Sequence, residues 1–210
     1  MGFRLWHGTE IVALDVEGSG AQDRGTEAIL EVAIVPLAHG RPDLGQAFTS
    51  LVNPGRPIPQ RPWLSPGLSN AVLADAPPLE QIAPRLVELV EGRWVVGHNI
   101  NVDWRLLSRH LPSLRPAGLL DTLLLARALN FPKCSLSALV DNLRLHETMQ
   151  AAAGGSQPHR AYWDTVATAH LLSRLISRRW PVKPPTFESL RLAAGVALPT
   201  GPVDQPDLFG

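Results

Sequence analysis

The chain has 210 residues, of which 45% are hydrophobic, and its 19 lysines and arginines balance 19 aspartates and glutamates. This length and composition favour one globular domain with a substantial core. The neutral balance argues against a protein that coats duplex DNA through many phosphate contacts, although a strand end can be held without a basic excess. No apolar run approaches the roughly 20 residues of a membrane span, and the single Cys134 excludes an internal disulfide. We therefore expect a cytoplasmic protein with no membrane partner.

The first predicted strand ends in two carboxylates. An apolar run over 11–14 leads to Asp15 and Glu17, and the pattern breaks at Gly18. Side chains two apart in a strand point to the same face, so both carboxylates are expected to face one cleft. Two neighbouring carboxylates at the end of a buried strand repel each other, which favours a bound cation as their partner. Taken alone, the pattern also fits an ordinary strand end with a solvated acidic turn.

Two further apolar stretches, 28–37 and 46–52, follow after short connections. We expect them to pair antiparallel with the first strand. Glu31 interrupts the second stretch, and we interpret it as an edge or partner-satisfied residue rather than as a metal ligand. The proline-rich segment 53–78 is expected to cross the surface as an irregular connection.

Helices and strands alternate in the next part of the chain. The predicted elements are a helix over 79–90, a strand over 93–97, a helix over 101–111 and a strand over 118–120. Asp121 is placed to cap a helix over 122–129, and Ser135 to cap a helix that runs through Leu143. Strands followed by this alternation predict an α/β fold with a mixed sheet.

The last third contains the longest helical pattern, from about residue 160 to 178, with an apolar stripe that predicts packing along the core. The segment 146–158 before it is predicted to be the loosest part of the domain. Prolines follow Trp180, and 186–194 is expected to form one short helix. We predict a domain over residues 1–180 and a proline-rich tail over 181–210, of which the part over 196–210 is expected to be largely disordered.

Three separate segments together bring four carboxylates and a histidine. They are Asp15-Val16-Glu17, Gly97-His98-Asn99-Ile100-Asn101-Val102-Asp103 and His159-Arg160-Ala161-Tyr162-Trp163-Asp164. This order resembles the DEDDh 3′–5′ exonucleases, a family that includes the proofreading epsilon subunit of bacterial DNA polymerase III. Each part is weak as a motif, but the combination is specific. The resemblance spans roughly 11–178 and implies a ribonuclease-H-like fold, a mixed sheet flanked by helices.

The resemblance implies a role for each of these residues. Asp15, Glu17, Asp103 and Asp164 are the expected ligands of two Mg²⁺ or Mn²⁺ ions, and His159 is the expected general base. A pair of such ions about 4 Å apart stabilises both the attacking and the leaving oxygen in phosphodiester hydrolysis. In an ideal helix, residues five apart lie about 140° from each other. His159 and Asp164 therefore share a site only if His159 lies in the lead-in to the helix.

Other residues receive lesser roles. Ser19 is expected to bond the terminal nucleotide, whereas His98 and Asn99 are expected to fix the turn before a helix. The stretch 65–69 stands where the resembled family carries a loop that touches this nucleotide, but it has Pro66 in place of the family's histidine. Three rings offer base stacking, and core packing is favoured for each of them: Trp63, Trp104 and Trp163.

The leading hypothesis is a 3′–5′ exonuclease that releases nucleoside monophosphates from single-stranded or frayed DNA 3′ ends, in replication proofreading or repair. One alternative is an RNA-trimming exoribonuclease, because contacts to a 2′-hydroxyl leave no signature in the sequence. Another is a non-catalytic adaptor of the replication machinery. The clustered carboxylates argue against the adaptor, since an adaptor has no physical need for them.

The tail contains Gln205-Pro206-Asp207-Leu208-Phe209, which resembles the short peptides that dock proteins on the bacterial sliding clamp. Leu208 and Phe209 are the expected apolar anchors, Gln205 the polar contact at the rim, and Asp207 the fourth matched position. The alternative is a proline-rich tail whose match is accidental. We predict weak clamp binding through these four residues.

Overall fold

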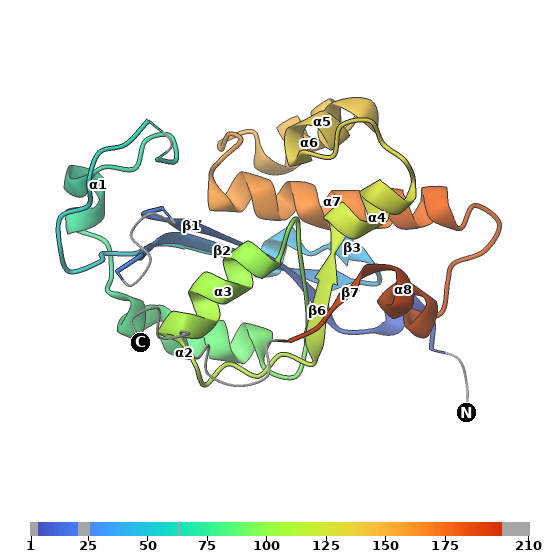
Figure 1. Cartoon of the computed structure of the whole chain (residues 1–210), viewed down its shortest axis with the longest axis horizontal. Helices are drawn as coiled ribbons and strands as arrows, with labels where there is room; N and C mark the ends of the chain where they lie inside the picture. Colours follow the sequence, from blue (N-terminus) through green and yellow to red (C-terminus); the bar gives the residue numbers. More distant parts are fainter. Residues whose placement is uncertain (1–3, 21–25, 63, 199–210) are drawn as a thin grey trace, which may run out of the picture.

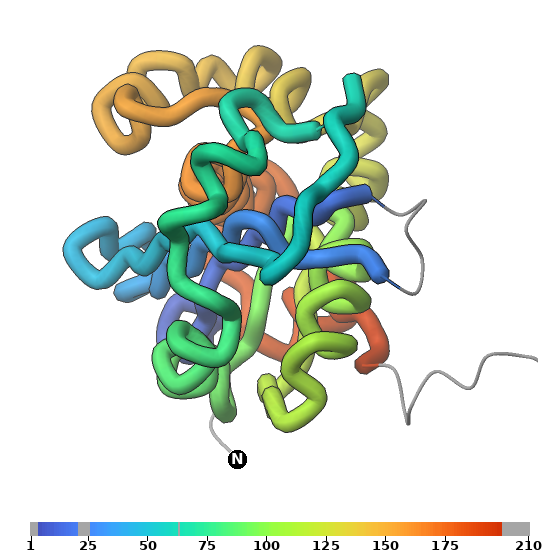
Figure 2. Tube along the Cα trace, turned by 90° about the vertical axis from the view of Figure 1, so that its left-hand side faces the viewer, coloured from blue at the N-terminus to red at the C-terminus, as the bar shows by residue number. Residues whose placement is uncertain are grey.

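The computed structural model describes residues 4–20, 26–62 and 64–198. In this part a mixed sheet runs through the molecule with helices on both faces, as Figures 1 and 2 show from two directions. The strands are β1 Ile11–Gly18, β2 Ile29–Ala38, β3 Arg41–Pro42, β4 Phe48–Leu51, β5 Trp94–Gly97, β6 Gly118–Asp121 and β7 Gly195–Val196. The helices are α1 Asn70–Ala74, α2 Leu79–Val90, α3 Asn101–His110, α4 Thr122–Ala128, α5 Leu136–Asn142, α6 His146–Ala153, α7 Ala161–Arg179 and α8 Phe187–Ala194. The predicted α/β fold is confirmed.

The strand β1 lies in the middle of the sheet and organises both cores. The strand order is β3-β2-β1-β5-β6-β7, and β4 also pairs with β2. β1 runs antiparallel to β2 and parallel to β5, as the short first connections and the later helical crossover require. Ile11 and Ala13 pack in the same core as α7, whereas Val12 and Leu14 pack with α2 and α3 on the opposite face. By this alternation Asp15 and Glu17 continue the face that α7 covers.

The turn after β5 is fixed by the side chains expected to fix it. His98 bonds Thr122 Oγ1 through Nδ1 at 2.9 Å and the Cys134 carbonyl through Nε2 at 2.8 Å. Asp121 caps α4 by accepting from Leu123 N at 2.8 Å, and it also accepts from Asn99 N at 2.9 Å. The predicted cap at Asp121 and the structural role of His98 are confirmed, whereas Asn99 contributes its backbone N–H and a role for its side chain stays a prediction.

The segment predicted to be loosest contains a helix, α6, so that prediction is wrong. Met149 and Ala153 lie four residues apart and are both buried in the core with α7. Two buried positions are too few to produce a clear helical period, although the alanine run 151–153 favours a helix. Figure 1 shows α5 and α6 stacked on the outer side of α7.

The chain beyond residue 180 continues into a helix and a strand that pack on the rest of the fold. The helix expected over 186–194 is present as α8, and its Leu190 and Ala194 are fully buried. β7 follows directly and pairs antiparallel with β6. The folded unit therefore includes the chain up to Leu198, the last described residue. The clamp-like peptide and the predicted flexible tail beyond it lie outside the described residues. In the described part of the chain, no helix has the length and apolarity to cross a membrane.

Candidate active site

Three of the predicted ligands meet where β1 ends beside the start of α7. Asp15 and Glu17 extend from β1, and Asp164 lies in the first turn of α7. One carboxylate oxygen from each of these three residues lies within 4.8 Å of the other two. Oxygen atoms at such separations are able to bind one small divalent cation, and carboxylates are the ligands that Mg²⁺ and Mn²⁺ prefer. The side chains therefore fit the metal that the sequence predicts.

Asp103, the fourth predicted ligand, lies in the first turn of α3 and outside this three-oxygen cluster. It is buried, and its Oδ1 accepts a hydrogen bond from Val16 N at 3.2 Å. Its charge nevertheless acts on Asp15, since Asp103 is the largest charged contributor to the raised pKa of that residue. Asp103 thus stands beside the cluster, and its role as a metal ligand stays a prediction.

His159 occupies the lead-in to α7, as its spacing from Asp164 requires. The helix begins at Ala161, and His159 has a φ of 65°, in the left-handed region. Its backbone N–H donates to Asp164 Oδ1 at 3.3 Å, and its side chain is exposed. A positive charge on His159 also lowers the pKa of Glu17. An exposed imidazole beside the acids is the arrangement that a general base needs.

Ser65 is a site residue that the sequence did not single out. Its hydroxyl donates to Glu17 Oε2, and its side chain is buried. Ser65 belongs to the stretch matched to the nucleotide-contacting loop of the family, so the signal was present in that match. This loop contacts the site through the hydrogen bond from Ser65 to the Glu17 carboxylate.

Arg160 and Glu31 form a second group that the sequence did not connect. Glu31 lies on β2 directly opposite Glu17 on β1. Arg160 donates to both of its carboxylate oxygens, at 2.7 Å from Nε and 2.9 Å from Nη2. The interpretation of Glu31 as a partner-satisfied residue is confirmed.

Ser19 is 2% exposed and forms hydrogen bonds with the backbone just before β2. Its Oγ accepts from Ala28 N, and its own N–H donates to the Ala28 carbonyl, both at 2.9 Å. This pairing holds the end of β1 against the start of β2, while contact with a nucleotide stays a prediction. Trp104 and Trp163 are buried, which confirms core packing for both, and Trp63 lies outside the described residues.

Burial is the main cause of the raised pKa values of the acids in the cluster. It raises the pKa of Asp15 well above the ordinary value, that of Asp103 to about 8, and those of Glu17 and Asp164 to about 7. Neighbouring negative charges raise each of these pKa values further. Near neutral pH the metal-free cluster therefore keeps part of its protons, which a bound cation would displace.

We expect the metal-free protein to lose stability as pH rises from about 4 to about 8. A carboxyl whose pKa is raised in the folded state binds more protons there than in the unfolded chain, so unfolding releases protons and is favoured by higher pH. The melting temperature in EDTA, followed across this range, measures the effect, and adding Mn²⁺ should remove most of the decline. Asp15→Asn should show a flatter profile than the wild type in EDTA, and two parallel profiles would contradict the acid cluster as the cause.

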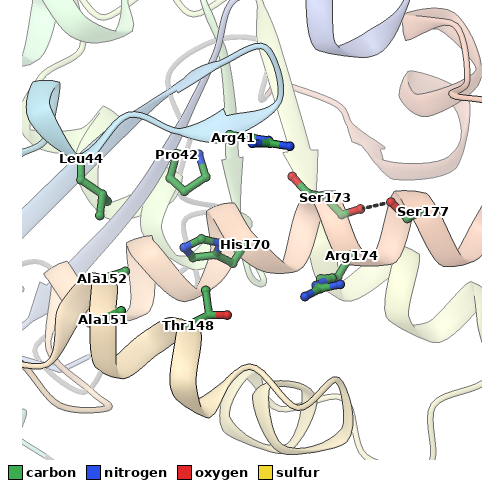
Figure 3. Close-up of a pocket in the computed structure, with 10 residues that line it drawn as sticks. All are labelled: Arg41, Pro42, Leu44, Thr148, Ala151, Ala152, His170, Ser173, Arg174 and Ser177. Carbon is green, nitrogen blue, oxygen red and sulfur yellow. Dashed lines mark hydrogen bonds between the residues drawn. The ribbon is translucent and has the colours of Figure 1, made fainter.

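A hollow on another part of the described surface lies away from these acids. This cavity of about 670 Å³ is situated between β3, α6 and the outer side of α7, and Figure 3 shows its lining. Its residues are Arg41, Pro42, Leu44, Thr148, Ala151, Ala152, His170, Ser173, Arg174 and Ser177. It contains none of the predicted site residues, so we place the active site at the carboxylate cluster.

Comparison with known proteins identifies the family of the chain. The family model RNase_T, described as exonuclease, matches residues 12–172. The DNA polymerase III subunit epsilon-like protein of Rhodobacter capsulatus is 34% identical over 171 residues, which are 79% of this chain and 23% of that protein. DNA polymerase III subunit epsilon of Aquifex aeolicus is 30% identical over 183 residues, which are 84% of this chain and 84% of that protein. The chain spans 19% of another relative, the 3′-5′ exonuclease DinG of Bacillus subtilis, so it covers only a small part of the first two curated relatives it matches.

Among solved structures, Exonuclease X in complex with 5′ overhanging duplex DNA superposes with a TM-score of 0.65 and 26% sequence identity. The match covers 86% of this chain and 98% of that one. The nuclease domain of 3′hExo, a DEDDh family member bound to rAMP, has a TM-score of 0.63 at 13% identity and supports the fold alone. The ribonuclease-H-like exonuclease fold is therefore confirmed, and the family match includes the segments that carry Asp15, Glu17, Asp103, His159 and Asp164. The chain belongs to the RNase_T exonuclease family, among the DEDD 3′–5′ exonucleases related to the epsilon subunit of DNA polymerase III.

Proposed function

We propose that the protein is a metal-dependent 3′–5′ exonuclease that releases nucleoside monophosphates from single-stranded or frayed DNA ends in replication proofreading or repair. The observation that carries the proposal is the cluster of Asp15, Glu17 and Asp164 oxygens within 4.8 Å, with His159 bonded to Asp164 through its backbone. The DNA-bound Exonuclease X relative and the two epsilon relatives favour DNA as the substrate.

The proposed mechanism assigns separate tasks to the residues. Asp15, Glu17, Asp103 and Asp164 hold two Mg²⁺ or Mn²⁺ ions, which supply stabilisation of charge on the attacking and leaving oxygens. His159, exposed at the rim, takes the proton from the water that attacks the terminal phosphate, which is the role of a general base. Ser65 holds Glu17 in place by donating to its Oε2.

End-labelled oligonucleotides test the proposal. Single-stranded DNA, duplex DNA with a mismatched 3′ end, and RNA of the same sequence are incubated with the protein and Mg²⁺ or Mn²⁺. We expect stepwise shortening from the 3′ end with release of monophosphates, and DNA degraded faster than RNA. Faster loss of RNA would favour the exoribonuclease, and intact substrates with both metals would leave the adaptor as the remaining function.

We also propose that the tail peptide over 205–209 docks the exonuclease on a bacterial sliding clamp. Leu208 and Phe209 supply two adjacent apolar anchors, and Gln205 and Asp207 complete the matched pattern. Ordering a short peptide opposes binding, so we expect a dissociation constant in the micromolar range, about 10 µM. Such tethering raises the local concentration of the enzyme near a primer end.

A peptide of residues 201–210 titrated with the clamp from the same bacterium measures this contact. Replacing Leu208 and Phe209 by Ala in the full chain should remove clamp binding and leave the rate on free oligonucleotides unchanged. Absence of binding by the wild-type peptide at about 100 µM clamp, about ten times the expected constant, would contradict the assignment.

A further inference from the structure

Arg160 connects three segments that surround the carboxylate cluster. Its guanidinium donates to Glu31 on β2 at 2.7 and 2.9 Å, and its Nη1 donates to the Pro66 carbonyl at 3.4 Å. Pro66 follows Ser65, whose hydroxyl bonds Glu17. Arg160 itself is the residue immediately before α7. One side chain thus links β2, the loop that contains Ser65 and the start of the helix that carries Asp164.

The partner of Arg160 is the buried Glu31, and both of its carboxylate oxygens accept hydrogen bonds. The side chain of Glu31 is 6% exposed, and that of Arg160 is 26% exposed. Besides the two bonds from Arg160, Glu31 Oε2 accepts from Ala161 N, the first amide of α7, at 3.2 Å. Paired charge-assisted bonds of this kind impose a defined geometry as well as stability. Removing Arg160 leaves a buried charge without its partner, which costs much more than losing an exposed ion pair.

The same contacts determine where His159 lies. His159 directly precedes Arg160, and its φ of 65° lies in the left-handed region, which only a few per cent of residues other than glycine adopt. Glu31 stands opposite Glu17 in the sheet, so the distance from Glu31 to Arg160 and Ala161 sets the distance from the β1 acids to the start of α7. A displacement of about 1 Å between reacting groups lowers a rate by about 100-fold.

We propose that Arg160 is a positioning residue for the hydrolysis proposed above, acting through Glu31 and Pro66 to hold His159 and Asp164 against Asp15 and Glu17. The inference rests on that proposed function for its catalytic consequence. It assigns Arg160 no contact with substrate, because the Nε and Nη2 groups bond Glu31 and Nη1 faces Pro66.

The first test compares kinetic constants of Arg160 variants on single-stranded DNA. Arg160→Gln should lower kcat by about 10- to 100-fold and change KM by less than about threefold, since positioning acts on the chemical step. Arg160→Lys should recover only part of the rate, because a lysine cannot bond both oxygens of Glu31 and the Pro66 carbonyl together. Adding Glu31→Gln to Arg160→Gln should cost less than the sum of the two single changes, since the uncompensated buried charge is then gone.

Hydrogen exchange gives a second readout that needs no activity. Amides of residues 159–164 should exchange faster in Arg160→Gln than in the wild type, because the lead-in to α7 has lost its anchor. Arg105→Gln is the matched control: Arg105 also pairs with a buried acid, Glu27, at 2.8 Å, but from α3. Its exchange over 159–164 should equal that of the wild type, and its kcat should stay within about threefold.

The outcomes separate the two proposals. If the wild type cleaves DNA and Arg160→Gln keeps its kcat, or changes only KM, Arg160 is no positioning residue. Unchanged exchange over 159–164 in Arg160→Gln would also overturn the proposal. If the wild type cleaves nothing while exchange still rises in Arg160→Gln, the Arg160–Glu31 pair is a structural contact that holds the start of α7. Both the catalytic role of Arg160 and the proposed function are then wrong.

Discussion

Replacing Asp164 by Asn should lower the rate of DNA hydrolysis by about three orders of magnitude or more. The amide keeps an oxygen that accepts from His159 N, so the lead-in to α7 keeps its bond, while the charge that completes the three-oxygen cluster is removed. Stabilisation of the reacting oxygens by divalent ions contributes several kcal/mol, and each 1.36 kcal/mol corresponds to tenfold in rate. Asp15→Asn should have an effect of the same size.

The folded state should survive both changes. Burial and mutual repulsion raise the pKa values of these acids, so removing one charge relieves repulsion in the metal-free protein. Melting temperature in EDTA at pH 8 should therefore be equal to or above that of the wild type. Glu188→Gln, which removes an exposed acid on α8, is the control and should leave the rate unchanged. Near-normal hydrolysis by either Asp15→Asn or Asp164→Asn would refute the metal assignment.

Changing His159 should lower kcat by about two to four orders of magnitude, the scale of general-base catalysis. Because His159 has a left-handed backbone, His159→Ala combines loss of the base with backbone strain. Asparagine and glycine accept this conformation, so His159→Asn and His159→Gly remove the imidazole without the strain. We expect all three variants to lose the near-neutral limb of the pH–rate profile.

Binding distinguishes a base from a residue that merely places the substrate. The affinity for a DNA oligonucleotide, measured in Ca²⁺ or EDTA, should change by less than about fivefold in His159→Asn, because a general base acts in the transition state. A collapse of DNA affinity with the single-turnover rate preserved would make His159 a substrate-positioning residue.

The sequence predicts the acids well because local rules position them. A period of two places Asp15 and Glu17 on one face of β1, and the spacing of His159 from Asp164 correctly requires a lead-in before α7. Arg160 and Glu31 were out of reach, because they are 129 residues apart and meet only once β2 and α7 have packed. The bond that Asp103 accepts from Val16 was hidden for the same reason.

Short elements were the other source of error. α6 buries only Met149 and Ala153 as a helical pair, and β7 has only two residues. Neither is long enough to show a clear period, so the segment 146–158 was wrongly predicted to be loose. Proline content beyond Trp180 suggested a tail, but the short helix predicted there, which Thr186 caps by accepting from Ser189 N at 3.1 Å, packs against the core.

The position of α8 and β7 determines how far the chain can be shortened without exposing the edge of the sheet. β7 covers the outer edge of β6, whose Gly118–Asp121 backbone is otherwise open to pairing with another strand. Phe187 packs edge-on against Trp94, and its N–H donates to the Arg4 carbonyl at 2.8 Å, so the last helix also fastens the first residues. A protein cut at residue 180 would present an unprotected, apolar sheet edge of the kind that recruits strands from neighbouring molecules. We expect that shortened protein to aggregate during purification, and a protein ending at residue 198 to remain monodisperse.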